Sequence, residues 1–269
     1  MQLPFRILGI LNATPDSFYS GSRFGLDSVV EQAAKMVSDG ADALDVGGQS
    51  TRPGAEIVSE QEEIDRVLPI IELLSENFPS LTLSIDTFRA EVARQALNAG
   101  AHWVNDISFG EDDSNMFSTL LDFPRCGYIG MHKQGQIANM QSNPQYGNVT
   151  QEVQDYLLGR ASLLRQMGFE GPIALDPGFG FGKTLEHNYQ LLKNWKSFLD
   201  LPYPILMGIS RKSMIYKKLQ ITPEEALNGT SALHGMALSQ GPCMLRVHDV
   251  REARETITLV EAVLNSDSQ

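Results

Sequence analysis

The sequence contains little cysteine and no long apolar run, and these two absences limit the classes of protein that it can encode. Its two cysteines, Cys126 and Cys243, lack the spacing of a zinc site or a CxxC motif. We interpret them as reduced core thiols, which favours the cytosol. No run approaches the roughly 18 apolar residues that a membrane helix needs, and residues 1 to 18 lack a signal-peptide pattern. We therefore expect a cytoplasmic protein with no membrane partner.

Basic residues are also scarce. The chain has 21 Lys and Arg against 33 Asp and Glu, which gives a formal net charge of -12 at pH 7. Because nucleic acids and anionic lipids require a basic surface, this charge disfavours both as partners. An anionic ligand must then be held by a local group of cations. The 42% of hydrophobic residues suffices for a large core, and 269 residues are close to the roughly 250 of one (β/α)8 barrel. We expect one domain over residues 1–269.

Short apolar runs alternate with longer amphipathic stretches, which is typical of repeated βα units around a parallel sheet. Ser59 and Glu62, for example, have the spacing of a helix capping box, and apolar residues with helical periodicity follow them. We count eight apolar runs and predict a (β/α)8 barrel. The predicted strands are 6–11, 43–47, 81–86, 103–106, 127–132, 173–176, 204–209 and 244–249.

Five predicted strands share one spacing, in which a glycine precedes a polar residue by five positions. The pairs are Gly40 with Asp45, Gly100 with Asn105, Gly127 with His132, Gly171 with Asp176, and Gly241 with Arg246. Glycine suits the turn that opens a strand, and the polar residue follows where the strand leaves the core. Asn12, Asp86 and Ser210 end other strands. Because parallel barrels bind ligands at the carboxyl ends of their strands, we expect an active site there.

Two glycine-containing loops follow predicted strands. In DVGGQSTRPGA (45–55), Thr51 and Arg52 could donate hydrogen bonds to an oxyanion, although a plain surface turn explains the loop equally well. The stretch DPGFGFGKT (176–184) ends like a phosphate-binding loop, but Pro177 occupies the position of a required glycine. With Phe179 and Phe181, this loop suits a planar, partly apolar ligand, unless both rings pack beneath it.

Cations cluster in the last third of the chain. Arg211 and Lys212 follow the seventh strand, Arg246 and His248 end the eighth, and we assign Lys183 to the same rim. Such loops often form a phosphate site in barrels. His132 also stands at a strand end. The carboxylates Asp86 and Asp176 could grip an amidine-like edge of a heterocycle, or could simply pair with Arg or backbone N–H groups.

In combination, these motifs resemble the dihydropteroate synthase family. The matching segments follow one another along nearly the whole chain: ILNATPDSF (10–18), DVGGQSTRPGA, SIDTFRAEVA (84–93), NDIS (105–108), MHKQG (131–135), DPGFGFGKT, GISRKSMI (208–215) and RVHDV (246–250). The resemblance implies transfer of a dihydropterin-methyl group from its diphosphate to 4-aminobenzoate, with release of pyrophosphate. It also implies Mg2+ as cofactor, a homodimer, and sulfonamides as competing ligands.

The resemblance further implies a role for each matching residue. Lys212, Arg246, His248 and Asp86 would be catalytic. The pterin would contact Asp86, Asn105, Asp176, Lys212 and Met131, and the diphosphate Asn12, Thr51, Arg52, Arg246 and His248. Asn12 would also bind the metal. The aminobenzoate would contact Phe18, Pro53, Phe179, Phe181, Arg211, Lys212 and Ser213.

Three positions depart from the family pattern: Gln49 replaces a common Glu, Ser20 a usual Asp, and Lys133 a common Met. The loss of two negative charges predicts altered loop ordering or Mg2+ coordination. A pterin-binding paralogue with little or no activity therefore stays open as an alternative. A folate-dependent methyltransferase is a second, although such an enzyme has no use for SRKS (210–213).

Overall fold

The computed structural model describes residues 3–13, 23–49, 58–136, 140 and 143–266. In these residues, eight parallel strands form one sheet in the order β6-β5-β4-β3-β2-β1-β8-β7. A parallel bridge between Leu175 and Ile205 joins the two outer strands, so the sheet closes on itself. The strands are β1 (Ile7–Asn12), β2 (Ala43–Gly47), β3 (Thr82–Asp86), β4 (Trp103–Asp106), β5 (Gly127–Met131), β6 (Ile173–Asp176), β7 (Leu206–Met207) and β8 (Met244–Val247).

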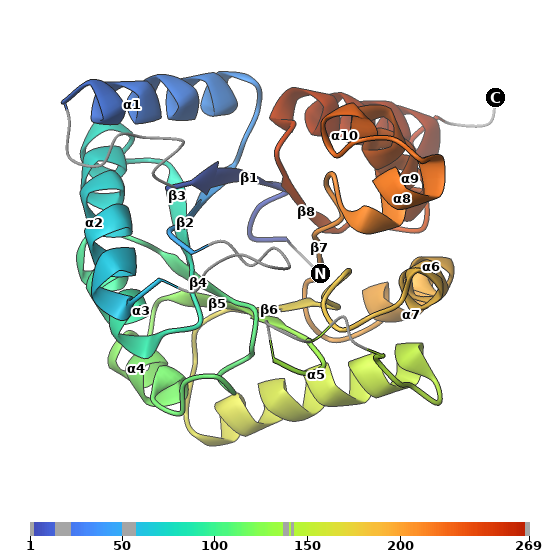
Figure 1. Cartoon of the computed structure of the whole chain (residues 1–269), viewed down its shortest axis with the longest axis horizontal. Coiled ribbons are helices and arrows are strands. Elements are labelled where there is room, and N and C mark those ends of the chain that lie inside the picture. The colour runs from blue at the N-terminus through green and yellow to red at the C-terminus, as the bar shows by residue number, and fades with distance from the viewer. Residues whose placement is uncertain (1–2, 14–22, 50–57, 137–139, 141–142, 267–269) are drawn as a thin grey trace.

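Helices surround this barrel and cover its outer face, as Figure 1 shows. The predicted capping signal is real, because Ser59 caps the second helix by accepting a hydrogen bond from the Glu62 amide. The helices are α1 (Arg23–Ser38), α2 (Glu60–Asn77), α3 (Ala90–Asn98), α4 (Met116–Asp122), α5 (Val149–Gln166), α6 (Leu185–Lys193), α7 (Trp195–Leu199), α8 (Ser213–Leu219), the 3-10 turn η1 (Glu224–Ala226), α9 (Leu227–Leu238) and α10 (Val250–Leu264). The predicted (β/α)8 barrel is confirmed.

The two-residue period of the strands divides their buried residues into two clusters. The larger cluster lies between sheet and helices and includes Leu44, Leu83 and Val104. The smaller one, which we call the apolar plug, comprises Phe5, Leu8, Ala43, Trp103, Ile129, Ala174, Leu206 and Met244. Its strand residues face the barrel interior, and Trp103 packs edge-on against Phe5 with ring centroids 5.3 Å apart. The plug therefore fills the amino-terminal half of the interior.

The five glycines with the shared spacing serve two purposes. Gly40, Gly100 and Gly241 have φ values of +103°, +113° and +147°, which L side chains rarely adopt. Gly127 and Gly171 are instead required by close packing, since a Cβ on Gly127 would lie 2.1 Å from the Trp103 ring. The predicted strand bounds lie within one residue of the observed ones except at two strands. The seventh was predicted over 204–209 but spans only Leu206–Met207, and the eighth was predicted to 249 but ends at Val247.

Candidate active site

The carboxyl ends of four neighbouring strands pair in register. Parallel pairing aligns Asn12 with Gly47, Gly47 with Asp86, and Asp86 with Asn105. Residues in register on adjacent strands face the same side of a sheet, so these positions share the barrel interior. Two residues earlier on β2, Asp45 is in register with Ser84. The predicted gathering of polar strand-end residues is therefore present.

Arg246 of β8 donates to two of these side chains, and a third, Asn105, joins them through Asp45. Its Nε atom donates to Asp45 Oδ2 at 2.6 Å, and a terminal nitrogen donates to Asp86 Oδ2 at 2.5 Å. Asn105 Nδ2 donates to the same Asp45 oxygen at 2.8 Å. Asp45 is completely buried, whereas the side chain of Asp86 is 14% exposed. Asp45 thus holds two other residues of the site without facing solvent itself.

Asp176 and Lys212 form the neighbouring part of the site. Asp176 Oδ1 accepts the Gly178 amide at 2.7 Å, and Lys212 Nζ donates to the Phe179 carbonyl at 2.6 Å. Lys212 Nζ also lies 4.6 Å from the centre of the Phe181 ring. We call Asp45, Asp86, Asn105, Asp176, Lys212 and Arg246 together the strand-end cluster. It combines carboxylates, an amide and cations with one aromatic face.

Burial shifts the charge states in this cluster. Desolvation raises the pKa of Asp86 to about 7, although the Arg246 cation opposes the shift. Desolvation also raises the pKa of Asp176, against the effect of Lys212. The pKa of Lys212 falls to about 8 because of burial, with Asp176 acting in the opposite direction. Perturbed titratable groups that converge at one place are typical of functional sites.

The other predicted rim residues are organised as pairs. Arg211 donates to both carboxylate oxygens of Asp249, at 2.9 and 2.6 Å, in the fork geometry of a strong ion pair. Ser210 Oγ and His248 Nδ1 lie 3.0 Å apart. Arg246 and His248 thus stand at the end of β8 as predicted, but the Arg211 guanidinium is already partly neutralised. Ser213 begins α8 directly after Lys212.

The assignment of Lys183 to the cationic rim was wrong. Lys183 is only 2% exposed, and its Nζ donates to the carbonyls of Gly178, Phe181 and His132. It also lies 2.9 Å from His132 Nδ1. Burial, followed by the Lys183 charge, lowers the pKa of His132 to about 2. Both residues therefore support the glycine-containing loop from beneath.

The Phe179 ring does not frame the site. It is fully buried and packs against Trp195, with ring centroids 5.9 Å apart, so only its carbonyl contacts the cluster. Phe181 is partly exposed and lies beside Lys212. Met131 is buried and in register with Asp176, and Asn12 is exposed at the end of β1. The predicted roles of Phe18, Ser20, Thr51, Arg52 and Pro53 lie outside the described residues.

Two departures from the family pattern have partners of their own. Gln49 Oε1 accepts the Val58 amide at 2.8 Å. Lys133 Nζ pairs with Asp112 at 2.9 Å and also donates to the Gly135 carbonyl. Both side chains are nearly buried. Each substitution is therefore integrated into local packing.

The sequence placed Asp45 among the polar strand-end residues but assigned it no contact with a substrate, and its place between Arg246 and Asn105 follows only from the closed barrel. No cluster of three or more His, Cys, Asp or Glu residues with metal-binding geometry occurs among the described residues.

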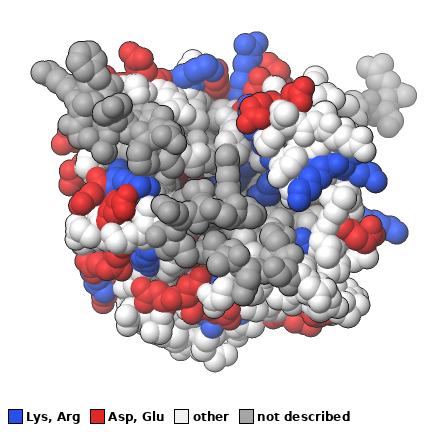
Figure 2. All heavy atoms as spheres, in the orientation of Figure 1, with Lys and Arg blue, Asp and Glu red and all other residues white. Residues whose placement is uncertain are grey.

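The surface of the molecule carries charges of both signs. Figure 2 shows Asp and Glu side chains around the rim of the face that it displays, with Lys and Arg interspersed. No helix in the described ranges has both the length and the apolar character for a membrane crossing.

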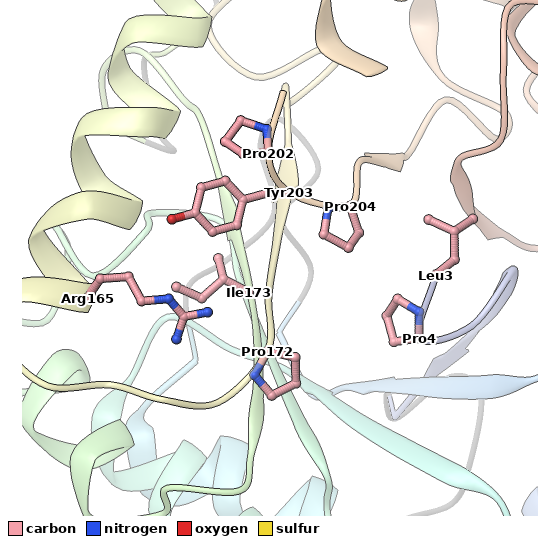
Figure 3. Close-up of a pocket in the computed structure, with 8 residues that line it drawn as sticks. All are labelled: Leu3, Pro4, Arg165, Pro172, Ile173, Pro202, Tyr203 and Pro204. Atoms are coloured by element: carbon pink, nitrogen blue, oxygen red, sulfur yellow. The ribbon is translucent and has the colours of Figure 1, made fainter. Parts of the chain in front are cut away.

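A shallow cavity of about 440 Å3 opens at the opposite, amino-terminal end of the barrel. Figure 3 shows its walls, which include four prolines, Tyr203 and Arg165. The Arg165 guanidinium already donates to the carbonyls of Phe169 and Gly171. None of the strand-end cluster lines this cavity. Because perturbed pKa values and convergent polar groups mark the carboxyl end, we place the candidate site there.

Fold and site together define a (β/α)8-barrel enzyme with a buried polar floor for a ligand. A family model described as pterin-binding enzyme matches residues 8–248. The dihydropteroate synthase of Escherichia coli K12 is 42% identical over 263 residues, which cover 97% of this chain and 92% of that protein. The chain therefore belongs to the pterin-binding enzymes and, within them, to the dihydropteroate synthase family.

Solved structures agree with this placement. A Yersinia pestis dihydropteroate synthase in a sulfonamide drug complex has a TM-score of 0.90 and 38% identity, covering 99% of this chain and 97% of the other. A Xanthomonas albilineans dihydropteroate synthase with 4-aminobenzoic acid has a TM-score of 0.87 and 36% identity, with coverages of 97% and 94%.

Proposed function

We propose that this chain is a dihydropteroate synthase, which joins 7,8-dihydropterin-6-ylmethyl diphosphate to 4-aminobenzoate and releases pyrophosphate. The strand-end cluster is the observation that carries the proposal. Its carboxylates and amide match the N–H and C=O groups along a pterin edge. Residues 1–269 would act as one domain in the cytoplasm.

Asp86, Asn105, Asp176 and Lys212 hold the pterin, with Met131 beneath it. The Asp176 carboxylate accepts paired N–H groups of the heterocycle, as a carboxylate does from a guanidinium. Lys212 stays close to Asp176 and donates to the pterin carbonyl. Because the cluster is largely buried, these interactions are stronger than they would be in water.

The diphosphate lies beside the pterin, where Asn12, Thr51, Arg52, Arg246 and His248 contact its oxygens. Arg246 is shared between Asp45 and Asp86, so its charge balances the floor as well as the leaving group. The amide oxygen of Asn12 is a hard donor at an exposed strand end and fits Mg2+, which keeps several waters and accepts few protein ligands. When bound, Mg2+ would add positive charge at the leaving diphosphate.

The aminobenzoate stands against the loops after β1, β2, β6 and β7. Phe181 and Ser213 line it with Phe18 and Pro53, Arg211 acts with its partner Asp249, and Lys212 stands between the two substrates. The amine attacks the exocyclic carbon of the pterin as the diphosphate leaves. The protein's contribution is positioning and charge stabilisation, with Lys212, Arg246, His248 and Asp86 around the reacting groups. Sulfonamides would compete for the same place.

We also propose a homodimer. Met236 of α9 and Leu259 and Val263 of α10 are 58%, 68% and 72% exposed, on helices that pack together. Large exposed apolar side chains on neighbouring helices favour self-association, and a two-fold axis would bury both copies of such a face. Val263→Glu should shift sedimentation toward the monomer, and an unchanged dimer would exclude this face.

One assay tests the function. The protein is incubated with Mg2+, the pterin diphosphate and 4-aminobenzoate, and pyrophosphate is measured with and without the amine. Aminobenzoate-dependent release supports the synthase. Pterin binding without release indicates a non-catalytic paralogue. Pterin binding with methyl transfer from a folate to a corrinoid protein indicates the methyltransferase.

A further inference from the structure

We propose that Asp45 is a positioning residue that sets which atom Asn105 offers to the pterin. This inference rests on the proposed function and deepens it. Asp45 is fully buried two residues before Gly47 ends β2, and two side chains donate to its Oδ2 atom, so it does not touch a ligand itself. It acts through the two side chains that donate to its Oδ2 atom.

Donor and acceptor rules decide which atom of the Asn105 amide faces Asp45. Asp45 Oδ2 accepts from Arg246 Nε, which is only a donor, at 2.6 Å. The Asn105 atom that lies 2.8 Å from the same oxygen must then be the amide nitrogen. The Asn105 oxygen Oδ1 accepts no hydrogen bond within the described residues. Asn105 therefore presents an acceptor, which selects a ligand with an N–H group at that point.

The burial of Asp45 supports a specific role for its Oδ2 atom. The other carboxylate oxygen of Asp45, Oδ1, is buried from solvent and accepts no hydrogen bond among the described residues. An unsatisfied buried oxygen destabilises the folded state. A carboxylate at this depth is therefore explained by the two bonds to Oδ2, which orient Asn105 and fix the plane of Arg246.

A double-mutant cycle separates orientation from general damage. Asn105→Ala should weaken binding of a 6-hydroxymethyl pterin about tenfold, because the acceptor at position 105 is lost. Asp45→Asn alone should also cost about tenfold, because an amide at position 45 no longer fixes which atom of Asn105 faces the ligand. In the double variant Asp45→Asn/Asn105→Ala, we expect the Asp45→Asn change to cost no more than about threefold, since the side chain that Asp45 orients is gone.

The matched control is Ser84→Ala. Ser84 is in register with Asp45 on the next strand, equally buried, and its Oγ has no hydrogen-bond partner in the described chain. We expect pterin affinity within about twofold of the parent for this variant. A merely structural role for Asp45 would lower stability without separating the KM for the pterin substrate from the KM for aminobenzoate. Our proposal predicts that the pterin KM rises while the aminobenzoate KM stays within about threefold.

Calorimetric titration with the pterin and thermal unfolding are measured on all variants. A cost of Asp45→Asn that is as large in the Asn105→Ala background as in the parent would overturn the proposal. So would Asp45→Asn with the affinity of Ser84→Ala. Failure of the proposed function looks different, because the parent itself would then bind no pterin. In that case the unfolding midpoints still decide, since coupling between the two substitutions supports the Asp45–Asn105 bond and additive effects refute it.

Discussion

The two halves of the barrel interior differ sharply although the same strands build both. In the lower half, inward positions are apolar and include Ala43, Trp103, Ala174 and Met244. Two residues further along each of these strands stand Asp45, Asn105, Asp176 and Arg246. Two residues advance a strand by only about 7 Å. A single strand period therefore separates a close-packed core from a charged site.

This proximity explains the charge states of the site. The apolar plug seals the barrel from below and keeps water away from the carboxylates above it. Burial then raises the pKa of Asp86 to about 7 and lowers that of Lys212 to about 8. The plug and the cluster consequently make separable contributions, one to folding and the other to ligand chemistry.

The largest expected effect comes from removing the Lys212 cation of the strand-end cluster. Lys212→Ala should lower kcat/KM about 1000-fold, close to 4 kcal/mol, because Lys212 interacts electrostatically with Asp176 and, in the proposed site, stands between both substrates. Steady-state pyrophosphate release measures it. Lys217→Ala, an exposed neighbour on α8, is the control. Full activity in Lys212→Ala would refute the assigned role.

Substitutions in the apolar plug should lower the free energy of unfolding. Trp103→Ala removes a buried ring that packs on Phe5 and should destabilise the fold by about 3 kcal/mol, measured by urea unfolding. Trp103→Phe should cost less because part of the ring volume remains. Pterin affinity of the folded protein should change much less than stability does. A loss confined to affinity would show that the two halves are not separable.

The burial of Asp86 should also appear in the pH dependence of stability. The pKa of Asp86 is raised in the folded protein from 3.8 to about 7. A raised carboxyl pKa stabilises the folded state at low pH, and this contribution disappears as pH rises toward 7. Between pH 5 and 7, the ligand-free parent should therefore lose about 2 kcal/mol relative to Asp86→Asn. Chemical unfolding at both pH values measures this difference, and parallel profiles would contradict it.

The smallest effect is expected at the family departures. Gln49→Glu keeps an oxygen that can accept the Val58 amide but puts a charge on a nearly buried side chain, so stability should fall by about 1 kcal/mol. Together with Ser20→Asp it restores two negative charges, and we expect a shift of about two- to fivefold in the Mg2+ concentration that supports half-maximal activity. Unchanged activity and unchanged Mg2+ dependence in both variants would refute this expectation.

Strand ends could be predicted from the sequence because glycine turns and polar residues recur at fixed spacing there. Side-chain direction beyond the strands could not. Phe179 and Phe181 are two residues apart in one loop, yet Phe179 packs on Trp195 whereas Phe181 lies beside Lys212. Lys183 carries the same charge as Lys212 but lies beneath the loop. These outcomes depend on partners distant in sequence, such as Trp195, His132 and Asp249, whose positions follow only from the closed barrel.

The most direct test of the account is pterin binding by the strand-end cluster. Titration calorimetry should compare the parent with Asp176→Asn, using a pterin that carries a 6-hydroxymethyl group. We predict one pterin bound per chain in the parent and a loss of at least about tenfold in Asp176→Asn, because an amide cannot accept two N–H groups as a carboxylate does. Equal affinity in the two proteins, or no binding by the parent, would contradict the assignment of the strand-end cluster as the pterin site.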